Sequence, residues 1–335
     1  MTSPANETSF LKHNGVLRER ENAERFPGVY VTMEEMVGLA NAHCQIDLHA
    51  QRRALAAMAG GHRSPFRGRG IDFDEVRVYN PGDDVRSIDW RVTARTGRPH
   101  TKVFREERER PVYLLVDQRQ SMFFGSRTAM KSVVAARIAA LLAWATREHG
   151  DRLGALIFND THSHEVRPKE GKRGIQAFFR VLVQFNQWLG ADQPRTRPSR
   201  QPISQALESL AHVVRPGSLV ILISDFQHFD DICVQQLRLV KRHSDIIALS
   251  INDVLERQLP PAGSYGYTDG EHSVRVNTSN KNFRKRFSLR FVEHQNELRD
   301  HFNSLGVPLI EIATDANLTE ALGRELGFRS RRGAK

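Results

Sequence analysis

Two runs of apolar residues, each ending near an aspartate, constrain the fold of this chain more than any other feature. Residues 112–116 lead directly into Asp117, and residues 219–223 lead, one residue later, into Asp225. Short apolar runs bounded by polar loops are typical of strands buried on both faces, as in parallel sheets. In an open parallel sheet, ligands bind beyond the carboxyl ends of the strands. The pattern therefore predicts one site that combines Asp117, Asp225 and the hydroxyl of Ser121.

Strand-like and helix-like segments alternate from residue 111 onward, which predicts an α/β fold with helices on both faces of a mostly parallel sheet. The predicted strands are residues 112–117, 152–158, 219–224, 246–251 and 308–312. The predicted helices are residues 129–149, 174–188, 203–213, 232–243, 282–305 and 318–326. We expect residues 260–280, which contain three glycines, to form an exposed turn and a hairpin.

The chain before residue 111 is organised differently. Its first 26 residues are polar, and we expect them to be flexible. Thr32 is a candidate N-cap for a helix that runs to about Met58, and residues 62–110 predict short strands and loops. The predicted parts are a flexible N-terminus (1–26), an N-terminal helix with a strand/loop region (27–110), the α/β domain (111–328) and a basic tail (329–335).

Composition narrows the class of protein. The apolar stretches are shorter than the about 20 residues that a membrane-spanning helix needs, and the N-terminus lacks the apolar core of a secretion signal. Two cysteines give no reason to expect a disulfide framework, so we expect a cytoplasmic protein. The net charge of +10 is spread widely, and no nucleic-acid-reading module accompanies it. A solvated basic surface is therefore favoured over nucleic-acid binding.

The strand-end aspartates allow two interpretations. Carboxylate and hydroxyl oxygens can hold a hard cation such as Mg²⁺, which keeps several of its waters. Alternatively, each aspartate caps the helix that follows its strand. The spacing alone does not decide between them. The sequence contains no hydrolase motif with a serine or cysteine nucleophile.

A long motif, Gly-Asp-Asp-x-Arg-x-Ile-Asp-Trp, lies between the N-terminal helix and the first apolar run. With it, the sequence resembles the von Willebrand factor A-like family of uncharacterised bacterial proteins encoded beside MoxR-type AAA+ ATPases (domain of unknown function 58). The likeness covers most of residues 62–326. The segments that carry it are residues 68–77, 79–95, 104–107, 114–117 and 224–226.

The resemblance implies a von Willebrand A-like α/β fold without catalytic machinery. Such domains bind protein ligands, often through a metal-ion-dependent adhesion site. That site combines Asp-x-Ser-x-Ser after the first strand, a Thr from a later loop and an Asp after the fourth strand. Asp117, Ser121 and Asp225 match this pattern, whereas Arg119 stands at the first Ser and Gln201 falls near the Thr.

Arg119 is the departure that matters most for a metal. A guanidinium about 5 Å from a cation repels it by roughly 3 kcal/mol at an effective dielectric constant near 20. The side chain could instead pair with Asp117 and Asp225 beside Ser224, replacing the metal by an ion-pair cluster. We therefore expect a degenerate site that requires no cofactor and binds Mg²⁺ or Mn²⁺ weakly or not at all.

The motif around Trp90 also allows two interpretations. Its charged and aromatic members are Asp83, Asp84, Arg86, Asp89, Trp90, Arg91 and Arg95. An internal ion-pair network, with Trp90 as its packing anchor, would fix a loop. The alternative is a docking surface for an ATPase, because aromatic and arginine residues dominate interface hot spots. The network is weighted somewhat higher.

The leading functional hypothesis is a non-enzymatic adaptor. As the resemblance implies, it would work with a MoxR-type AAA+ ATPase and a protein client in protein remodelling or complex maturation. The alternative is a metal-dependent phosphoester hydrolase, a nuclease or phosphatase that uses Asp117 and Asp225. A nucleic-acid binder driven by charge alone is a third option, and its affinity would fall steeply with salt.

Overall fold

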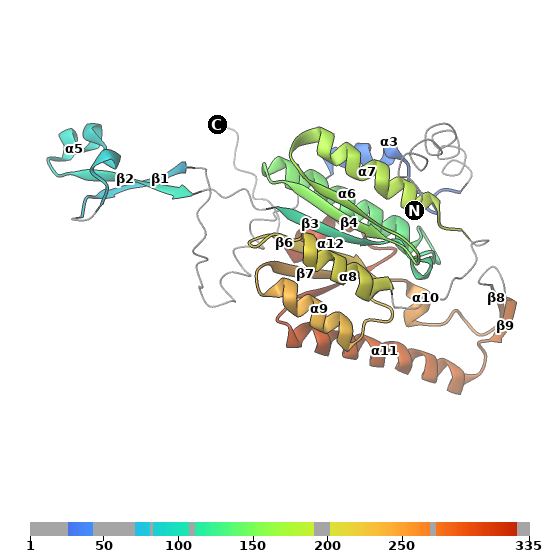
Figure 1. The fold of residues 1–335 in the computed structure, drawn as a ribbon. Coiled ribbons are helices and arrows are strands. Elements are labelled where there is room, and N and C mark those ends of the chain that lie inside the picture. Colours follow the sequence, from blue (N-terminus) through green and yellow to red (C-terminus); the bar gives the residue numbers. More distant parts are fainter. Residues whose placement is uncertain are drawn as a thin grey trace, which may run out of the picture. The chain divides into compact units, whose positions relative to one another are not determined.

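A computed structural model describes residues 26–42, 71–80, 83–106, 111–190, 202–268 and 273–326. These residues form two compact units, which are treated separately below. The larger unit combines residues 26–42 with the chain from residue 111 onward, and the smaller one lies within residues 62–110. Figure 1 labels the helices and strands of both.

A six-stranded sheet forms the centre of the larger unit. Its strands are β3 (Val112–Asp117), β4 (Leu153–Phe158), β5 (Ser163–Lys169), β6 (Leu219–Ser224), β7 (Asp245–Asn252) and β10 (Leu309–Ala313). They lie in the order β10-β7-β6-β3-β4-β5, and every neighbouring pair is parallel except β4–β5. The chain thus leaves β3 toward β4 on one side and later adds β6 on the other. The carboxyl ends of β3 and β6 therefore flank the topological switch point of the sheet.

Helices cover both faces of this sheet (Figure 1). One face packs against α6 (Lys131–Glu148), α7 (Gly171–Gln187) and α12 (Leu318–Leu326). The other packs against α8 (Pro202–Val213), α9 (Asp231–Lys241) and α11 (Lys281–Ser304). Side chains of β3 alternate between these two cores, with Leu114 and Val116 on the first face and Tyr113 and Leu115 on the second.

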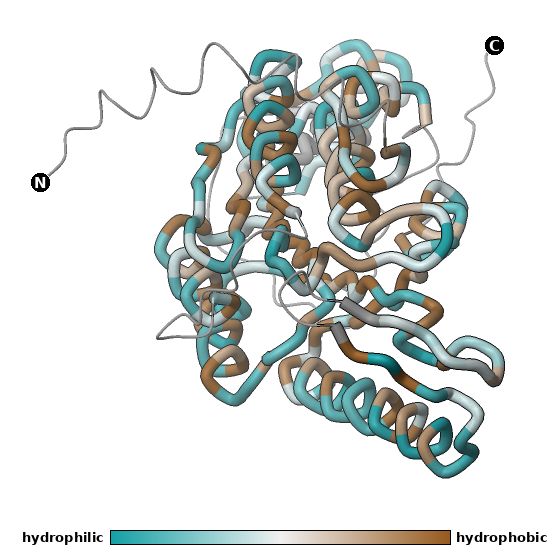
Figure 2. Tube along the Cα trace, turned by 90° about the vertical axis from the view of Figure 1, so that its right-hand side faces the viewer, coloured by the Kyte–Doolittle hydropathy of each residue, from teal (hydrophilic) through white to brown (hydrophobic). Residues whose placement is uncertain are grey.

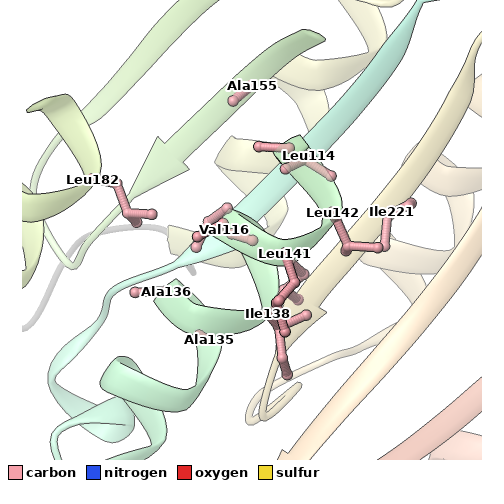
Figure 3. Packing of buried hydrophobic residues seen from close by; sticks show 14 of the residues in the cluster. Leu114, Val116, Ala135, Ala136, Ile138, Leu141, Leu142, Ala155, Leu182 and Ile221 are labelled. Atoms are coloured by element: carbon pink, nitrogen blue, oxygen red, sulfur yellow. The ribbon is translucent and has the colours of Figure 1, made fainter. Parts of the chain in front are cut away.

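Helix α6 is the centre of the first core. Fifteen of its 18 residues are buried, so it is apolar nearly all round and not amphipathic. Figure 3 shows Leu142 of α6 pointing toward Ile221 of β6, with Val116 of β3 close by.

The N-terminal segment also belongs to the larger unit. Thr32 caps α3 (Met33–Gly38) by accepting a hydrogen bond from the backbone N–H of Glu35, as the sequence predicts. The indole of Trp144 on α6 donates to the carbonyl of Met36. The predicted grouping of this segment with the strand/loop region is therefore wrong.

The predicted N-terminal helix starts where the sequence indicates, but its described α-helical part is short. Helix α3 ends at Gly38 and continues as a 3₁₀ turn, Leu39–Asn41. The rest of the predicted helix, to about Met58, lies outside the described residues. So do residues 1–25 of the predicted flexible N-terminus and the basic tail at residues 329–335.

The smaller unit contains an antiparallel pair, β1 (Ile71–Val78) and β2 (His100–Glu106). Short strands were predicted here, but helix α5 (Trp90–Thr96) was not. Its start is encoded locally, because Asp89 accepts hydrogen bonds from the backbone N–H groups of Arg91 and Val92. Gly97 ends the helix in the left-handed conformation that glycine favours.

Two further elements of the larger unit lie between β7 and α11. The predicted hairpin is present as β8 (Ser264–Thr268) and β9 (Ser273–Asn277), and a short helix, α10 (Val254–Arg257), precedes it.

The antiparallel edge strand β5 was absent from the predicted strands, since it is polar and exposed along most of its length. Among the described helices, none combines the length and the apolar character needed to cross a bilayer.

Candidate functional site

The switch point brings together the two aspartates predicted from the strand ends. Asp117 is the last residue of β3, and Asp225 directly follows β6, the neighbouring parallel strand. Both side chains are buried, with Asp117 fully inaccessible to solvent. The hydroxyl of Ser224 donates to Oδ2 of Asp117 at 2.6 Å and so ties the two strand ends together.

Arg119 lies between the two carboxylates. Its Nε donates to both carboxylate oxygens of Asp117 at 3.0 Å, and its Nη2 reaches Oδ2 of Asp117 at 2.6 Å. The same Nη2 donates to Oδ1 of Asp225 at 3.3 Å, while Nη1 donates to the carbonyl of Gln227 at 3.1 Å. Arg119 is only 2% exposed, so its charge faces protein groups and not solvent. The guanidinium therefore fills the space between the two strand-end carboxylates.

A second buried cation, Lys131, joins the cluster from the first turn of α6. Its Nζ donates to Oδ2 of Asp225 at 2.8 Å and to Oε1 of Glu256 on α10 at 2.6 Å. The sequence analysis missed Lys131 and Glu256. The available signal is weak: a lysine at a helix start opposes the helix macrodipole and therefore needs a compensating partner.

These contacts decide the ionisation of the cluster. Burial would raise the pKa of Asp225, but Lys131 and Arg119 outweigh it and hold that pKa at about 2. For Lys131, burial favours the neutral amine, yet Asp225 and Glu256 raise its pKa above the ordinary value. Burial raises the pKa of Asp117, and the guanidinium of Arg119 acts in the opposite direction. Three carboxylates and two cations thus share one largely buried network.

A third aspartate at a strand end lies next to this buried network. Asp253 follows β7, is fully buried, and accepts hydrogen bonds from Ser126 and from the hydroxyl of Thr314. It also forms a capping box with Glu256 on α10, the same glutamate that binds Lys131. Burial would raise the pKa of Asp253, but the hydrogen bonds from Ser126 and Thr314 lower it overall. This residue was absent from the predicted site.

The remaining predicted members behave differently. The hydroxyl of Ser121 is buried but has no hydrogen-bond partner among the described residues, so the structure does not join it to either aspartate. Gln201 lies outside the described residues. Ser224, predicted as a lining residue, supplies a hydroxyl to Asp117 directly.

The cluster does not fit a divalent metal. Both oxygens of Asp117 are engaged by Arg119, and Oδ2 also accepts from Ser224. Both oxygens of Asp225 are likewise engaged, by Lys131, Arg119 and the backbone N–H of Gln227. Across the ranges that the structure describes, no three His, Cys, Asp or Glu side chains are grouped as metal ligands would be. The oxygens that a cation needs already bind fixed cationic side chains.

Of the aspartates near Trp90, Asp84 and Asp89 cap helical turns, whereas Asp83 pairs with Arg77. Asp83 accepts from Arg77 at 2.7 Å and from the backbone N–H of Asn80, and these two bonds lower its pKa, the backbone bond more strongly. Asp84 caps the 3₁₀ turn at Val85–Ser87.

The predicted ion-pair network is therefore wrong in its main feature. Within the described part of the chain, the side chains of Arg86, Arg91 and Arg95 form no salt bridge. Trp90 is 69% exposed, so it does not anchor a packed loop. An exposed aromatic among unpaired arginines is the composition of an interface hot spot.

Residues 75–297 match the family described as "Protein of unknown function DUF58". The chain belongs to that family. It is also 28% identical over 298 residues to "Uncharacterized protein Mb1516" of Mycobacterium bovis and to "Uncharacterized protein Rv1480" of Mycobacterium tuberculosis. These matches span 88% of this chain and 91% of each relative.

Two solved structures are similar to this DUF58 chain at 11% and 10% identity. They are the "conserved hypothetical protein BatB from Bacteroides thetaiotaomicron" and the "SpRpn10 VWA domain", with TM-scores of 0.40 and 0.38. The matches cover 65% and 66% of this chain and 97% of each structure. The von Willebrand A-like fold of the DUF58 chain, predicted from its sequence, is evident in the strand order and the antiparallel edge strand.

Proposed function

We propose that this DUF58 chain is a non-enzymatic adaptor that works with a MoxR-type AAA+ ATPase in protein remodelling or complex maturation. The observation that carries the proposal is the buried guanidinium of Arg119 between Asp117 and Asp225. Because those carboxylates already hold a fixed cation, they are poor candidates for binding a catalytic metal. The fold also supports an interaction role, because the resemblance described above is to von Willebrand A-like domains, which bind protein ligands.

In this proposal, a partner protein binds at the carboxyl ends of β3 and β6 without a metal. Arg119 and Asp225 both bind the backbone of Gln227, at its carbonyl and its N–H. The residues on either side, Phe226 and His228, adopt positive φ angles of 52° and 63°, each costing on the order of 1 kcal/mol. The cluster therefore holds a strained loop in one conformation and leaves His228 exposed at the rim. A preformed loop of this kind loses little entropy when a partner binds.

The ATPase would dock on the smaller unit in this scheme. Trp90 offers a large exposed aromatic surface, and the unpaired arginines beside it suit an acidic partner. The resemblance to MoxR-associated proteins is strongest in this motif, which supports assigning the ATPase to it.

An affinity-capture experiment tests the adaptor role. The full chain is immobilised in lysate of its native cell, with and without ATP, and captured proteins are identified by mass spectrometry. We expect an AAA+ ATPase, with at least tenfold less captured by Trp90→Ala, as for an interface hot spot. Trp188→Ala is a matched control, because Trp188 is 41% exposed on the larger unit. Capture of no ATPase, or equal loss in both variants, contradicts the proposal.

The hydrolase alternative is tested separately. The chain is assayed with added Mn²⁺ against nuclease and phosphatase substrates, in parallel with Asp225→Asn. Metal-dependent turnover that disappears in this variant would replace the adaptor proposal by an enzyme.

A further inference from the structure

We propose that the N-terminal half of α11 docks on an anionic membrane surface. The docking surface, called the basic face below, combines exposed basic and aliphatic side chains of one helix. Its members are Lys281, Lys285, Arg286, Leu289, Arg290 and Val292.

The charge of this half-helix opposes what stability alone would select. Residues 281–292 contain five basic residues and no acidic one, whereas Glu293, Glu297 and Asp300 lie in the second half. A helix N-terminus carries a partial positive charge that fades beyond the first turn, so Lys281 and Arg284 there are unfavourable by about 0.3–1 kcal/mol each. Such an arrangement is explained by an anionic partner outside the helix.

One basic residue of the segment binds other parts of the protein, unlike the four basic members of the basic face. Arg284 is half-buried and donates to the backbone carbonyls of Leu259 and Pro260. The four basic members of the basic face are exposed and form no ion pair or hydrogen bond among the described residues. Their charges therefore remain available to a ligand.

Packing leaves this face open. The buried residues of α11, which are Gln295, Leu298 and Phe302, all belong to its second half. Figure 2 shows the N-terminal end of α11 beside the β8–β9 hairpin, with hydrophobic and hydrophilic residues alternating along the helix. The helix is 24 residues long and begins at a regular Asn280 cap, so it is a continuous rod in which the first half presents its outer side to solvent.

The apolar members favour a lipid surface over nucleic acid. Leu289 and Val292 are 48% and 51% exposed and lie one turn apart between basic residues. Aliphatic side chains of this kind insert at the boundary between lipid headgroups and acyl chains. Proteins that bind single strands stack bases on exposed aromatic rings, but the three phenylalanines of this half-helix are at least partly buried. Basic residues near an anionic bilayer each strengthen binding about fivefold.

Vesicle co-sedimentation of the full chain tests the proposal. One set of vesicles is phosphatidylcholine alone, and the other contains roughly a third phosphatidylglycerol. We expect binding to the anionic vesicles only, weakened by salt. The triple substitution Lys285→Ala, Arg286→Ala and Arg290→Ala should lower the partition coefficient roughly a hundredfold. Leu289→Ala with Val292→Ala should lower it several-fold without removing any charge.

The controls separate this face from general basicity. Lys172, Arg173 and Arg180 are exposed basic residues of α7, and their triple alanine variant should bind vesicles like the wild type. All substituted side chains are exposed, so unchanged melting temperatures verify that each variant is folded. The proposal fails if anionic vesicles are not bound or if the α7 variant loses as much binding as the α11 variant. It also fails if single-stranded oligonucleotides are bound while vesicles are not. No ATPase is present, so the result does not depend on the proposed adaptor role.

Discussion

Replacing Arg119 by serine tests whether the guanidinium stands in for a cation. The variant restores the Asp-x-Ser-x-Ser pattern between Asp117 and Ser121. It removes the hydrogen bonds that Arg119 makes to Asp117, Asp225 and Gln227. Removing one partner of a buried ion pair costs about 3–5 kcal/mol, because the other charge stays buried without compensation. For a chain of this size we expect the melting temperature to fall by roughly 10 °C.

Divalent metal should then rescue the variant and not the wild type. In Arg119→Ser, one cation of the cluster is gone and the carboxylates of Asp117 and Asp225 face a vacated volume. A metal at about 100 times its dissociation constant adds about 2.7 kcal/mol of stability, which recovers over half of the loss. Lys131 remains beside Asp225, so the affinity will be lower than in a site built of oxygen ligands alone.

The assay is thermal unfolding during titration with MgCl₂ or MnCl₂ at constant ionic strength. Arg127→Ser is the matched control, since Arg127 is 59% exposed and pairs with Asp315 at the surface. That variant should lose less than about 1 kcal/mol and gain nothing from metal. The argument would be refuted if Arg119→Ser were as stable as the wild type. It would also be refuted if metal stabilised both proteins equally.

Further predictions concern single contacts of the fold. The pKa of Asp225 is held at about 2, below the ordinary 3.8, so its charged form contributes about 2 kcal/mol to stability above pH 4. This contribution disappears as the pH falls from 4 through 2, and urea unfolding across this range measures it. Asp225→Asn should remove that part of the acid dependence. Trp144→Phe leaves the carbonyl of Met36 without its buried donor and should cost about 1–3 kcal/mol, seen as faster proteolysis of the N-terminal segment. Burial raises the pKa of Cys233 to about 12, so iodoacetamide at pH 8 should not modify it until the protein is unfolded.

The main strands and the meeting of Asp117 with Asp225 could be predicted because local pattern determines them. The apolar runs of β3 and β6 identify buried strands, and parallel pairing brings their ends together. Lys131 and Glu256 could not be found this way, since they lie 125 residues apart and meet only in the folded chain. Strand β5 lacked an apolar pattern because it is an exposed edge.

The surroundings of Trp90 illustrate a different limit. Aspartates close to a tryptophan in sequence fit either an ion-pair network or a series of helix caps. The distinction depends on whether other elements cover the ring, and neighbouring residues carry no information about that. Asp89 fulfils a capping role that its position just before a helical segment allows. Among the described residues, the side chains of Arg86, Arg91 and Arg95 form no salt bridge.

The antiparallel strand β5 also bears on how copies of this chain behave when crowded. Among the described residues, no further strand pairs with the outer edge of β5. An unprotected edge strand can pair with strands of other chains and so promote aggregation. Here, His164, Glu165, Arg167 and Lys169 place polar or charged groups along it, and Pro168 lacks the amide hydrogen that a new neighbour would need. Edge-to-edge pairing of two copies through β5 is thereby discouraged.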